Sequence, residues 1–465
     1  MSASELPEPL PEPVTEPLAE PLPERLPERL AALLARARGR TDRLVGSLTD
    51  AELFAQPIDF LSPVVWDVAH IGSFEELWLV RQLGGSRLTD EEFDRLYDAF
   101  EQPRGVRGGL PLLDRQQSRA YLTEVRDEAL GVLTRTPLDP DDPLTRDGYL
   151  HRMIVQHESQ HQETIVQSLL IRDDLDAPLP LPPPPPVTGP VDDTDRVLIP
   201  GGPTTVGTHD RVWAYDNERG AHVVDVPTFT LDRYPVTCRR YAAFIAAGGY
   251  ERPELWTPRG WAWRQETGVD APQGWVRAVD GGWDIRRGGR LVPLDPREPV
   301  AHVSWFEADA FARFDGGRLP TEQEWERAAR HDPTTGVARR YPWGDAAPTP
   351  ARANLGLRRA GPDPVGSHPS GASAYGVEQL AGDVYEWTSS PFAPYPGFVA
   401  FPYREYSEVF FGGDYQVLRG SSWAIAEPFA RATYRNWDHP YRRQIVAGLR
   451  VARDGDATVA SRGGR

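Results

Sequence analysis

The 465-residue sequence contains no lysine, so all 51 of its basic residues are arginine. This absence excludes Schiff-base catalysis, a pyridoxal-phosphate lysine and the lysine of a phosphate-binding loop. Cysteine occurs once, at Cys238, which excludes an intrachain disulfide and any cysteine-rich metal or redox site. A chain with a single thiol suits a reducing compartment, so we expect a cytoplasmic protein.

Long apolar runs are also missing. No segment approaches the roughly 18 apolar residues of a membrane span, and the first residues are acidic and proline-rich, unlike a secretory signal. The net charge of −17 argues against non-specific binding to nucleic acid. Since 40% of the residues are hydrophobic and 14 are tryptophan, we expect a globular enzyme of two or three domains.

A proline-rich segment divides the chain. Residues 1–24 repeat Glu-Pro-Leu-Pro-like units and should form a disordered tail. Residues 178–195, with five consecutive prolines from Pro182, should form a semi-rigid linker outside any core. Between them, residues 25–177 show four helical patterns and should form a four-helix bundle. The first pattern covers residues 26–48, the third residues 112–134 and the fourth residues 149–176. The second begins after Ser62-Pro63, a pair suited to the cap and first turn of a helix.

Residues 196–455 have a different character. Short β-like runs alternate with glycine, tryptophan and turn signals, which is typical of a loop-rich α+β domain. Two helices are expected, one from Ser304-Trp305 to Phe314 and one opened by a capping box of Thr321 and Glu324. Residues 456–465 should form a second disordered tail. The sequence has no glycine-rich dinucleotide fingerprint and no nucleophile elbow.

The most informative motif is His157-Glu-Ser-Gln-His161, inside the expected helix at residues 149–176. Helical spacing places His157 and His161 side by side on a face that is otherwise apolar. A single histidine on such a face is usually a packed core residue, whereas two imidazoles four residues apart have the spacing of transition-metal ligands. The motif therefore predicts a metal site, with packed histidines as the alternative.

A third ligand is expected from another helix. His70 is the best candidate because it lies on an aromatic core stripe, although a buried histidine bonded to a carboxylate is the alternative. Glu163 follows His161 by two residues, so its side chain points about 200° away and should brace a ring nitrogen or a neighbouring helix. His151 also points elsewhere. Three neutral imidazoles suit zinc with a bound water, or iron(II) with free coordination positions for substrates and dioxygen. The spacing alone does not decide between the two metals.

In this order the motifs resemble those of the ergothioneine-biosynthesis sulfoxide synthases, also called hercynine oxygenases. The resemblance covers roughly residues 26–455. In the first half it rests on Trp66-Asp-Val-Ala-His70 and on the paired-histidine motif. In the second half it rests on four phrases: Arg318-Leu-Pro-Thr-Glu-x-Glu-Trp-Glu326, Gly382-Asp-Val-Tyr-Glu-Trp387, Leu418-Arg-Gly-Ser-Ser-Trp423 and Arg435-Asn-Trp-Asp438. It implies a multi-domain α and α+β fold, in which a DinB-like four-helix bundle precedes a C-type-lectin-like domain similar to the formylglycine-generating enzyme.

The resemblance implies a non-haem iron(II) enzyme that uses dioxygen. It would join the thiol sulfur of γ-glutamylcysteine to the imidazole C2 of hercynine (Nα-trimethylhistidine) and oxidise the sulfur to a sulfoxide. The implied iron ligands are His70, His157 and His161. With hercynine, γ-glutamylcysteine and dioxygen as its partners, we expect a monomer that binds neither nucleic acid nor membrane.

The resemblance also implies roles for residues around the iron. Those expected beside hercynine are Gln160, Asn436 and, near the trimethylammonium group, Trp437. Such a group has no N–H and needs aromatic faces instead of hydrogen bonds. Those expected to grip the carboxylates and amine of γ-glutamylcysteine are Arg104, Arg107, Asp438 and Arg442. Each guanidinium can hold a carboxylate with two hydrogen bonds. A tyrosine would supply a proton or electron, with Tyr403 the first choice and Tyr406 the second.

Other functions stay open from the sequence alone. A zinc-dependent thiol S-transferase of the DinB type, with an accessory lectin-like domain, would work without oxygen. A related sulfoxide synthase would use free cysteine as the thiol donor. A non-catalytic binding protein would use the lectin-like domain and merely pack its histidines. The formylglycine-generating enzymes work through paired cysteines, and a chain with Cys238 alone lacks that copper–thiol chemistry.

Overall fold

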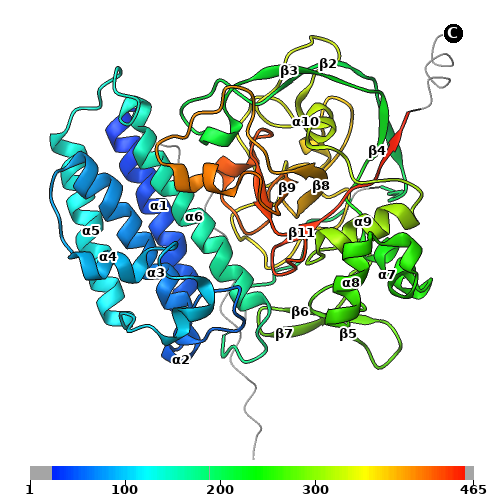
Figure 1. Ribbon diagram of the computed structural model, residues 1–465, viewed down its shortest axis with the longest axis horizontal. Helices are drawn as coiled ribbons and strands as arrows, with labels where there is room; N and C mark the ends of the chain where they lie inside the picture. The colour runs from blue at the N-terminus through cyan, green and yellow to red at the C-terminus, as the bar shows by residue number, and fades with distance from the viewer. Residues whose placement is uncertain (1–23, 178, 188, 456–465) are drawn as a thin grey trace, which may run out of the picture.

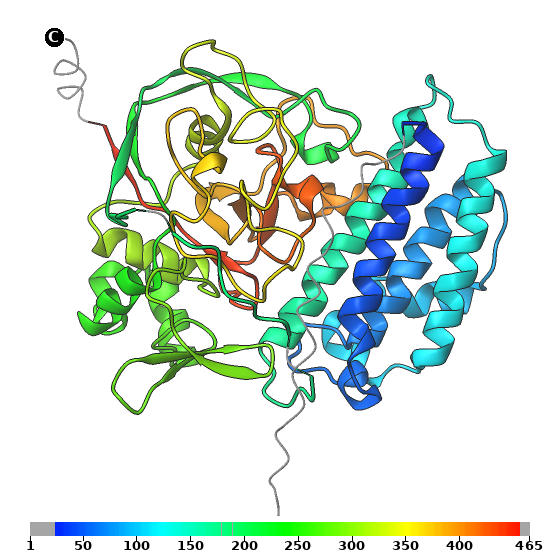
Figure 2. The same cartoon turned by 180° about the vertical axis from the view of Figure 1, so that it is seen from behind.

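The computed structural model describes residues 24–177, 179–187 and 189–455. A helical bundle and an α+β half lie side by side, seen from the front in Figure 1 and from behind in Figure 2. The expected tails, residues 1–24 and 456–465, lie outside the described residues apart from Glu24. Within the described ranges, no helix is both long and apolar enough to cross a membrane.

All four helices expected in the first half are present. They are α1 (Leu26–Gly46), α3 (Val64–Glu75), α5 (Arg115–Arg135) and α6 (Tyr149–Leu170). Shorter elements connect them: α2 (Asp50–Phe54), the π-helical turn η1 (Glu76–Leu83), α4 (Glu91–Tyr97), and the 3₁₀ turns η2 (Arg104–Gly109) and η3 (Arg146–Gly148). Apolar side chains on one face of each long helix fill the bundle core, among them Leu34, Val68, Val125 and Ile154.

Two helix ends differ from the sequence-based expectation. Pro63 is the N-cap of α3, so the expected cap residue, Ser62, lies one position outside the helix. Helix α6 ends at Leu170, short of the expected Asp176. Beyond the helix, Arg172 donates to the backbone carbonyl of Glu52 at 2.8 Å, and the Asp176 amide donates to the Glu52 carboxylate at 2.7 Å. These residues therefore bond to α2 instead of continuing the helix.

Buried charges reinforce the bundle. Glu75 of α3 receives hydrogen bonds from Arg38 of α1 at 2.8 Å and from Arg126 of α5 at 2.5 Å. Glu158 of α6 receives bonds from the same two arginines, at 3.0 Å and 3.3 Å. All four side chains are buried. Because each carboxylate meets two guanidinium groups, the charges compensate one another and link the four long helices.

The proline-rich segment after α6 is fastened to the rest of the protein. The expectation that it stays outside any core is wrong at Leu179, which is buried in the same apolar cluster as the bundle core. The Leu179 amide donates to the carbonyl of Gly288, and the carbonyl of Pro180 accepts from the amide of Ala360. Proline residues lack an N–H but keep a carbonyl acceptor, so the segment can still pair with its neighbours.

Among the described residues, the second half is built from short strands, four α-helices and short 3₁₀ turns. The strands are β1 (Arg196–Ile199), β2 (Gly202–Val206), β3 (His222–Val226), β4 (Phe229–Asp232), β5 (Trp275–Arg277), β6 (Trp283–Arg287), β7 (Arg290–Pro293), β8 (Tyr385–Pro391), β9 (Gln416–Arg419), β10 (Asn436–Asp438), β11 (Ala447–Gly448) and β12 (Ala452–Asp454). In the described ranges they form sheets of order β1-β4-β12, β2-β3, β5-β6-β7 and β10-β9-β8-β11. The helices are α7 (Cys238–Ala246), α8 (Pro258–Thr267), α9 (Trp305–Phe314) and α10 (Glu322–Arg330).

Helices α9 and α10 are the two that the sequence predicts in this half. Ser304 caps α9, and the capping box of Thr321 and Glu324 opens α10 as expected. Trp325 of α10 donates to Glu386 of β8 at 2.8 Å, which holds the helix against the sheet.

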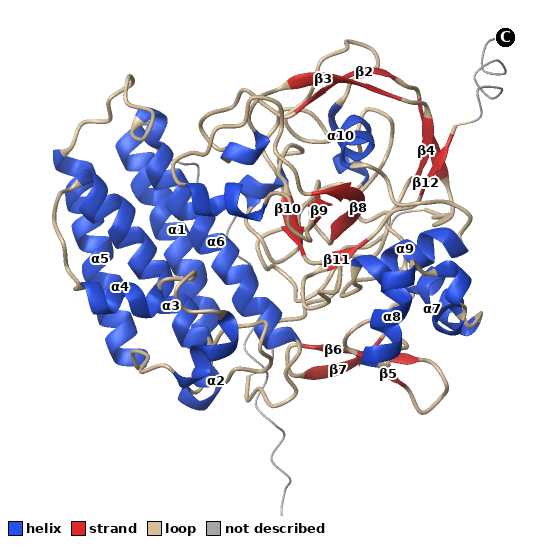
Figure 3. Cartoon of the chain, in the orientation of Figure 1, coloured by secondary structure: helices blue, strands red, loops and turns tan. Residues whose placement is uncertain are grey.

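Helix α6 lies between the two halves. The β10-β9-β8-β11 sheet lies on one side of α6 and α1 on the other (Figure 3). Ser159 of α6 accepts a hydrogen bond from the Ala426 amide at 3.0 Å. Trp423, from the second half, is buried in the apolar cluster of the bundle. The core is therefore continuous across α6, and side chains on this helix face both halves.

Candidate metal centre

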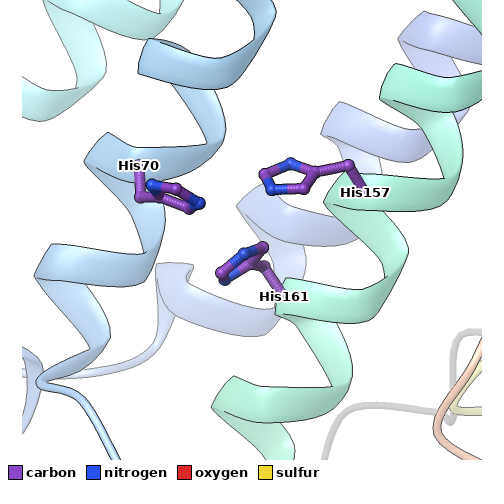
Figure 4. A group of neighbouring side chains, drawn as sticks. All are labelled: His70, His157 and His161. Carbon is purple, nitrogen blue, oxygen red and sulfur yellow. The ribbon is translucent and has the colours of Figure 1, made fainter. Parts of the chain in front are cut away.

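Three histidine rings meet between α3 and α6. His70 comes from α3, and His157 and His161 come from successive turns of α6 (Figure 4). Their ring centroids lie 4.5–5.1 Å apart. One nitrogen from each ring can be chosen so that all three lie within 4.8 Å of one another. Imidazole nitrogens this close can share one metal ion.

Hydrogen bonds set the tautomer of two of these rings. The Nδ1 atom of His70 lies 2.6 Å from the carbonyl oxygen of Tyr97, and that of His161 lies 2.9 Å from Asp67. A carbonyl or carboxylate oxygen accepts, so each Nδ1 carries the proton and each Nε2 keeps its lone pair for a metal. The sequence did not single out Asp67, although it stands one helical turn before His70 in the same motif.

Aromatic packing and burial prepare the rings as ligands. Trp66 stacks on His70 with centroids 4.8 Å apart, and Phe74 stacks on His157 at 3.8 Å. Burial lowers the pKa of both His70 and His157 well below the ordinary value for histidine, and the nearby His161 adds to the shift. Neutral imidazoles bind metals, so the three side chains fit a divalent ion.

A cavity of about 800 Å³ opens beside the histidines, between α6 and the second half. Every residue singled out for a site role in the sequence lines this cavity. From the bundle half these are His70, Arg104, Arg107, His157, Gln160 and His161. From the other half they are Tyr403, Tyr406, Asn436, Trp437, Asp438 and Arg442. His151 does not line it, as expected. The fold thus brings together residues that are up to 372 positions apart, from 70 to 442.

Gln160 is held by tyrosines from the second half. Its Oε1 atom accepts a hydrogen bond from the hydroxyl of Tyr215 at 3.0 Å. Its Nε2 atom donates to the hydroxyls of Tyr406 at 3.2 Å and Tyr434 at 3.4 Å. Tyr215 also stacks on Tyr406 with centroids 4.0 Å apart. Sequence reasoning missed Tyr215 and Tyr434, because no periodic pattern connects them to α6.

Tyr403 lies in the loop before the 3₁₀ turn η8 (Arg404–Tyr406) and packs against the bundle. Its ring centroid is 5.8 Å from that of Phe74 and 5.5 Å from that of Trp78. Burial raises the pKa of Tyr403 above the usual range, so its phenol keeps its proton at neutral pH.

The three arginines with expected substrate roles have different surroundings in the cavity. Arg107 is buried, donates to Ser62 at 2.8 Å, and lies 3.4 Å over the ring of Trp66. Burial lowers the pKa of Arg107 to about 10. Arg104 is exposed. Arg442 lies 3.7 Å from Asp438 and 3.9 Å over the ring of Phe60. Within the described chain, the Nε and Nη1 atoms of Arg442 have no hydrogen-bond acceptor.

Glu163 makes contacts that the sequence did not predict. We expected it to brace a ring nitrogen or a neighbouring helix, and that expectation is wrong. Its carboxylate accepts hydrogen bonds from Tyr385 at 3.1 Å and from the hydroxyl of Ser422, both in the second half, while Asp67 braces the ring nitrogen. Burial raises the pKa of Glu163 to about 7, although the two hydroxyl donors oppose the shift.

Cys238 takes no part in this site. It is buried in the core of the second half, and its sulfur lies 3.7 Å from the carbonyl oxygen of Pro299. Burial raises the pKa of its thiol well above the ordinary value. The single cysteine is therefore a packed core residue rather than a reactive one.

The two halves correspond to two known domain families. Residues 33–165 match the family described as "DinB superfamily", and residues 184–455 match the "Sulfatase-modifying factor enzyme 1-like domain". The second match includes more than half of the chain. Fold and site together define a two-domain protein in which a DinB-like bundle and a domain of the formylglycine-generating type enclose a histidine-lined cavity, and the expected fold class is confirmed.

Relatives that match nearly the whole chain identify the family. The chain is 49% identical over 430 residues to "Hercynine oxygenase" of Mycolicibacterium smegmatis, covering 90% of this chain and 97% of that one. It is 48% identical over 426 residues to the protein of that name in Mycobacterium tuberculosis, with 90% and 97% coverage. A "Formylglycine-generating enzyme" of Thermomonospora curvata is 34% identical over 217 residues, which cover 41% of this chain and 69% of that one. The chain belongs to the hercynine oxygenase family, and the expectation of an enzyme of the oxygenase kind is confirmed.

Proposed function

We propose that this protein is a non-haem iron(II), dioxygen-dependent sulfoxide synthase of ergothioneine biosynthesis. It would join the thiol sulfur of γ-glutamylcysteine to the imidazole C2 of hercynine. The observation that carries the proposal is the convergence of His70, His157 and His161 at one wall of a cavity shared by both halves. The names of relatives about half identical over nearly their whole length support hercynine as a substrate.

His70, His157 and His161 would hold the iron. When bound there, iron(II) would supply a site for the thiolate and would activate dioxygen. Three neutral ligands leave the ion its full positive charge, which favours deprotonation of an incoming thiol. Asp67 and the carbonyl of Tyr97 would keep two of the rings in the metal-binding tautomer.

Gln160, Asn436 and Trp437 would bind hercynine. Because hydrogen bonds to tyrosine hydroxyls hold both ends of the Gln160 amide, its orientation is set before substrate arrives. Asn436 and Trp437 are neighbours on β10, which pairs with β9 and so has a fixed register at the cavity wall. The indole face of Trp437 can attract the trimethylammonium group.

Arg442 and Asp438 would bind the charged ends of γ-glutamylcysteine. The guanidinium of Arg442 has donors to spare, and the adjacent Asp438 can accept from an ammonium group. Arg104, being exposed, can reach a second carboxylate. Arg107 already donates to Ser62 and to the backbone carbonyls of Gln102 and Ala99, so it would act on the thiol substrate mainly through its positive charge.

Tyr403 would donate or hold a proton at its phenolic oxygen. Its pKa is raised by burial, so the phenol is protonated when the substrates bind. Tyr406 is the second choice because its hydroxyl already accepts a hydrogen bond from Gln160.

Product and oxygen measurements test the proposal against a zinc-dependent thiol transferase. Oxygen consumption should require iron(II), hercynine and the thiol together, and mass spectrometry should detect the sulfoxide-linked product. Turnover without oxygen, or equal activity with zinc, would contradict it. Comparing γ-glutamylcysteine with free cysteine as donor decides between the two thiols.

A further inference from the structure

Glu163 is a buried carboxylate that faces the cavity without a cationic partner. It is 5% exposed and lies on α6 among the residues that line the cavity. Its hydrogen-bond donors, Tyr385 and Ser422, are both neutral hydroxyls. Among the described residues, none forms an ion pair with it. Burying a carboxylate without a compensating positive charge is costly, and a cation bound in the cavity would offset that cost.

Other acidic groups nearby do not share this property. Within the bundle, Glu75 and Glu158 each meet two arginines. Along the cavity, Asp94 pairs with Arg81 at 2.7 Å, and Asp438 has a guanidinium 3.7 Å away. Glu405 and Asp98 also line the cavity but are exposed, so water solvates their charges. Glu163 alone combines burial, access to the cavity and neutral partners within the described residues.

The position of Glu163 on α6 relates it to the metal centre. At about 100° per residue, Gln160 lies roughly 60° around the helix from His157, and Glu163 lies roughly 60° further in the same direction. Around α6, the side chains that line the cavity therefore follow one another in the order histidines, Gln160 amide, Glu163 carboxylate. A substrate with an imidazole at one end and a cation at the other matches this order.

We infer that Glu163 is the counter-ion for the trimethylammonium group of hercynine. The inference rests on the proposed function and adds to it the group that recognises the positive charge. A quaternary ammonium cannot donate a hydrogen bond, so the carboxylate attracts it through charge alone. The ring of Tyr434, which also lines the cavity, supplies an aromatic face beside it. Tyr385 and Ser422 hold the carboxylate in place, so no side-chain order is lost on binding.

A two-by-two binding experiment tests this inference. Wild type and the Glu163→Gln variant, both loaded with iron(II) under anaerobic conditions, are titrated calorimetrically with two ligands. One ligand is hercynine. The other is the isostere in which a tert-butyl carbon replaces the quaternary nitrogen, which removes the positive charge and keeps the carboxylate. Glu405→Gln, which removes an exposed carboxylate from the same cavity, is the matched control.

Wild type should bind hercynine at least tenfold more tightly than the isostere. In Glu163→Gln the affinity for hercynine should fall by a factor of about 10 to 100, whereas the affinity for the isostere should change by less than about threefold. Glu405→Gln should leave both affinities unchanged. If the Glu163→Gln chain does not fold, Glu163→Asp replaces it. This variant should lose less affinity for hercynine and none for the isostere.

Three results would overturn the inference. Equal binding of hercynine and the isostere by wild type would remove any role for the charge. An equal loss of affinity for both ligands in Glu163→Gln would make Glu163 a structural link between the two halves. Unchanged affinities in that variant would exclude it from the subsite. A wild-type enzyme that binds neither ligand would instead contradict the proposed function itself, so the two failures are distinguishable.

Discussion

The bundle and the α+β half contribute to one cavity by different means. The bundle supplies the three histidines from regular helices, and buried ion pairs between α1, α3, α5 and α6 hold those helices together. The other half supplies tyrosines, Asn436 and Trp437 from short strands and loops. Ligands of a metal need positions accurate to a fraction of an ångström, which packed helices provide, whereas recognition groups can vary on loops. On the proposed function, metal binding would belong to the bundle and substrate chemistry largely to the other half.

The largest effect is expected from removing a metal ligand of the bundle. His157→Ala should reduce iron binding by more than about 100-fold, because two imidazoles cannot replace three. Metal content after gel filtration measures this directly. His151→Ala is the matched control, since His151 is buried in the same helix but does not line the cavity. Equal iron in the two variants would remove His157 from the metal centre.

In the second half, Tyr403→Phe should abolish most turnover without loss of iron. Removing the phenolic proton should lower kcat by a factor of about 100 to 10,000, the usual range for a general acid. The ring contacts with Phe74 and Trp78 would persist, so stability should be unchanged. Tyr406→Phe is the comparison and should lose less. A larger loss in Tyr406→Phe would exchange the roles of the two tyrosines.

Breaking the ion network should damage the bundle rather than the chemistry. Glu158→Gln leaves Arg38 and Arg126 with one carboxylate between them, so the free energy of unfolding should fall by about 3–5 kcal/mol. Denaturant titration measures the loss. Glu128→Gln, which breaks a partly exposed pair with Arg135, should cost less than about 1 kcal/mol. Similar losses in both variants would mean that the buried network does not stabilise the bundle.

The smallest of these effects is expected at the thiol end of the cavity. Arg442→Ala should raise KM for γ-glutamylcysteine by about 10- to 100-fold, because a charge-assisted pair with a carboxylate is lost. Free cysteine lacks the γ-glutamyl group, so its KM should change much less. Initial rates with the two donors provide the test. Equal increases in KM for the two donors would show that Arg442 does not bind the γ-glutamyl carboxylate.

The two halves also differ in how much of their structure could be predicted from the sequence. Helix α6 and its two histidines could be predicted because residues 149–170 contain no glycine or proline and repeat with helical spacing. His70 follows from a second periodic stripe. Tyr403 and Tyr406 lie in a loop and a 3₁₀ turn, which leave no periodic signal, so only the family resemblance pointed to them.

The contacts of Glu163 show why the rest could not be predicted. Its partners, Tyr385 and Ser422, are 222 and 259 residues away in the chain. Helical geometry correctly directed this side chain away from His161, but the surface that it meets is set by how the second half packs on α6. The same holds for Tyr215, whose bond to Gln160 spans 55 residues. Such long-range pairings depend on tertiary packing and leave no local pattern.

The proposed function requires that His70, His157 and His161 bind one iron ion. An anomalous difference map, recorded at the iron absorption edge from anaerobic crystals of the iron(II) enzyme with hercynine, would locate that ion. We predict a single strong peak within coordination distance of the Nε2 atoms of all three histidines, with the substrate imidazole beside it. A peak that lacks any one of these histidines, or lies elsewhere in the molecule, would contradict the account.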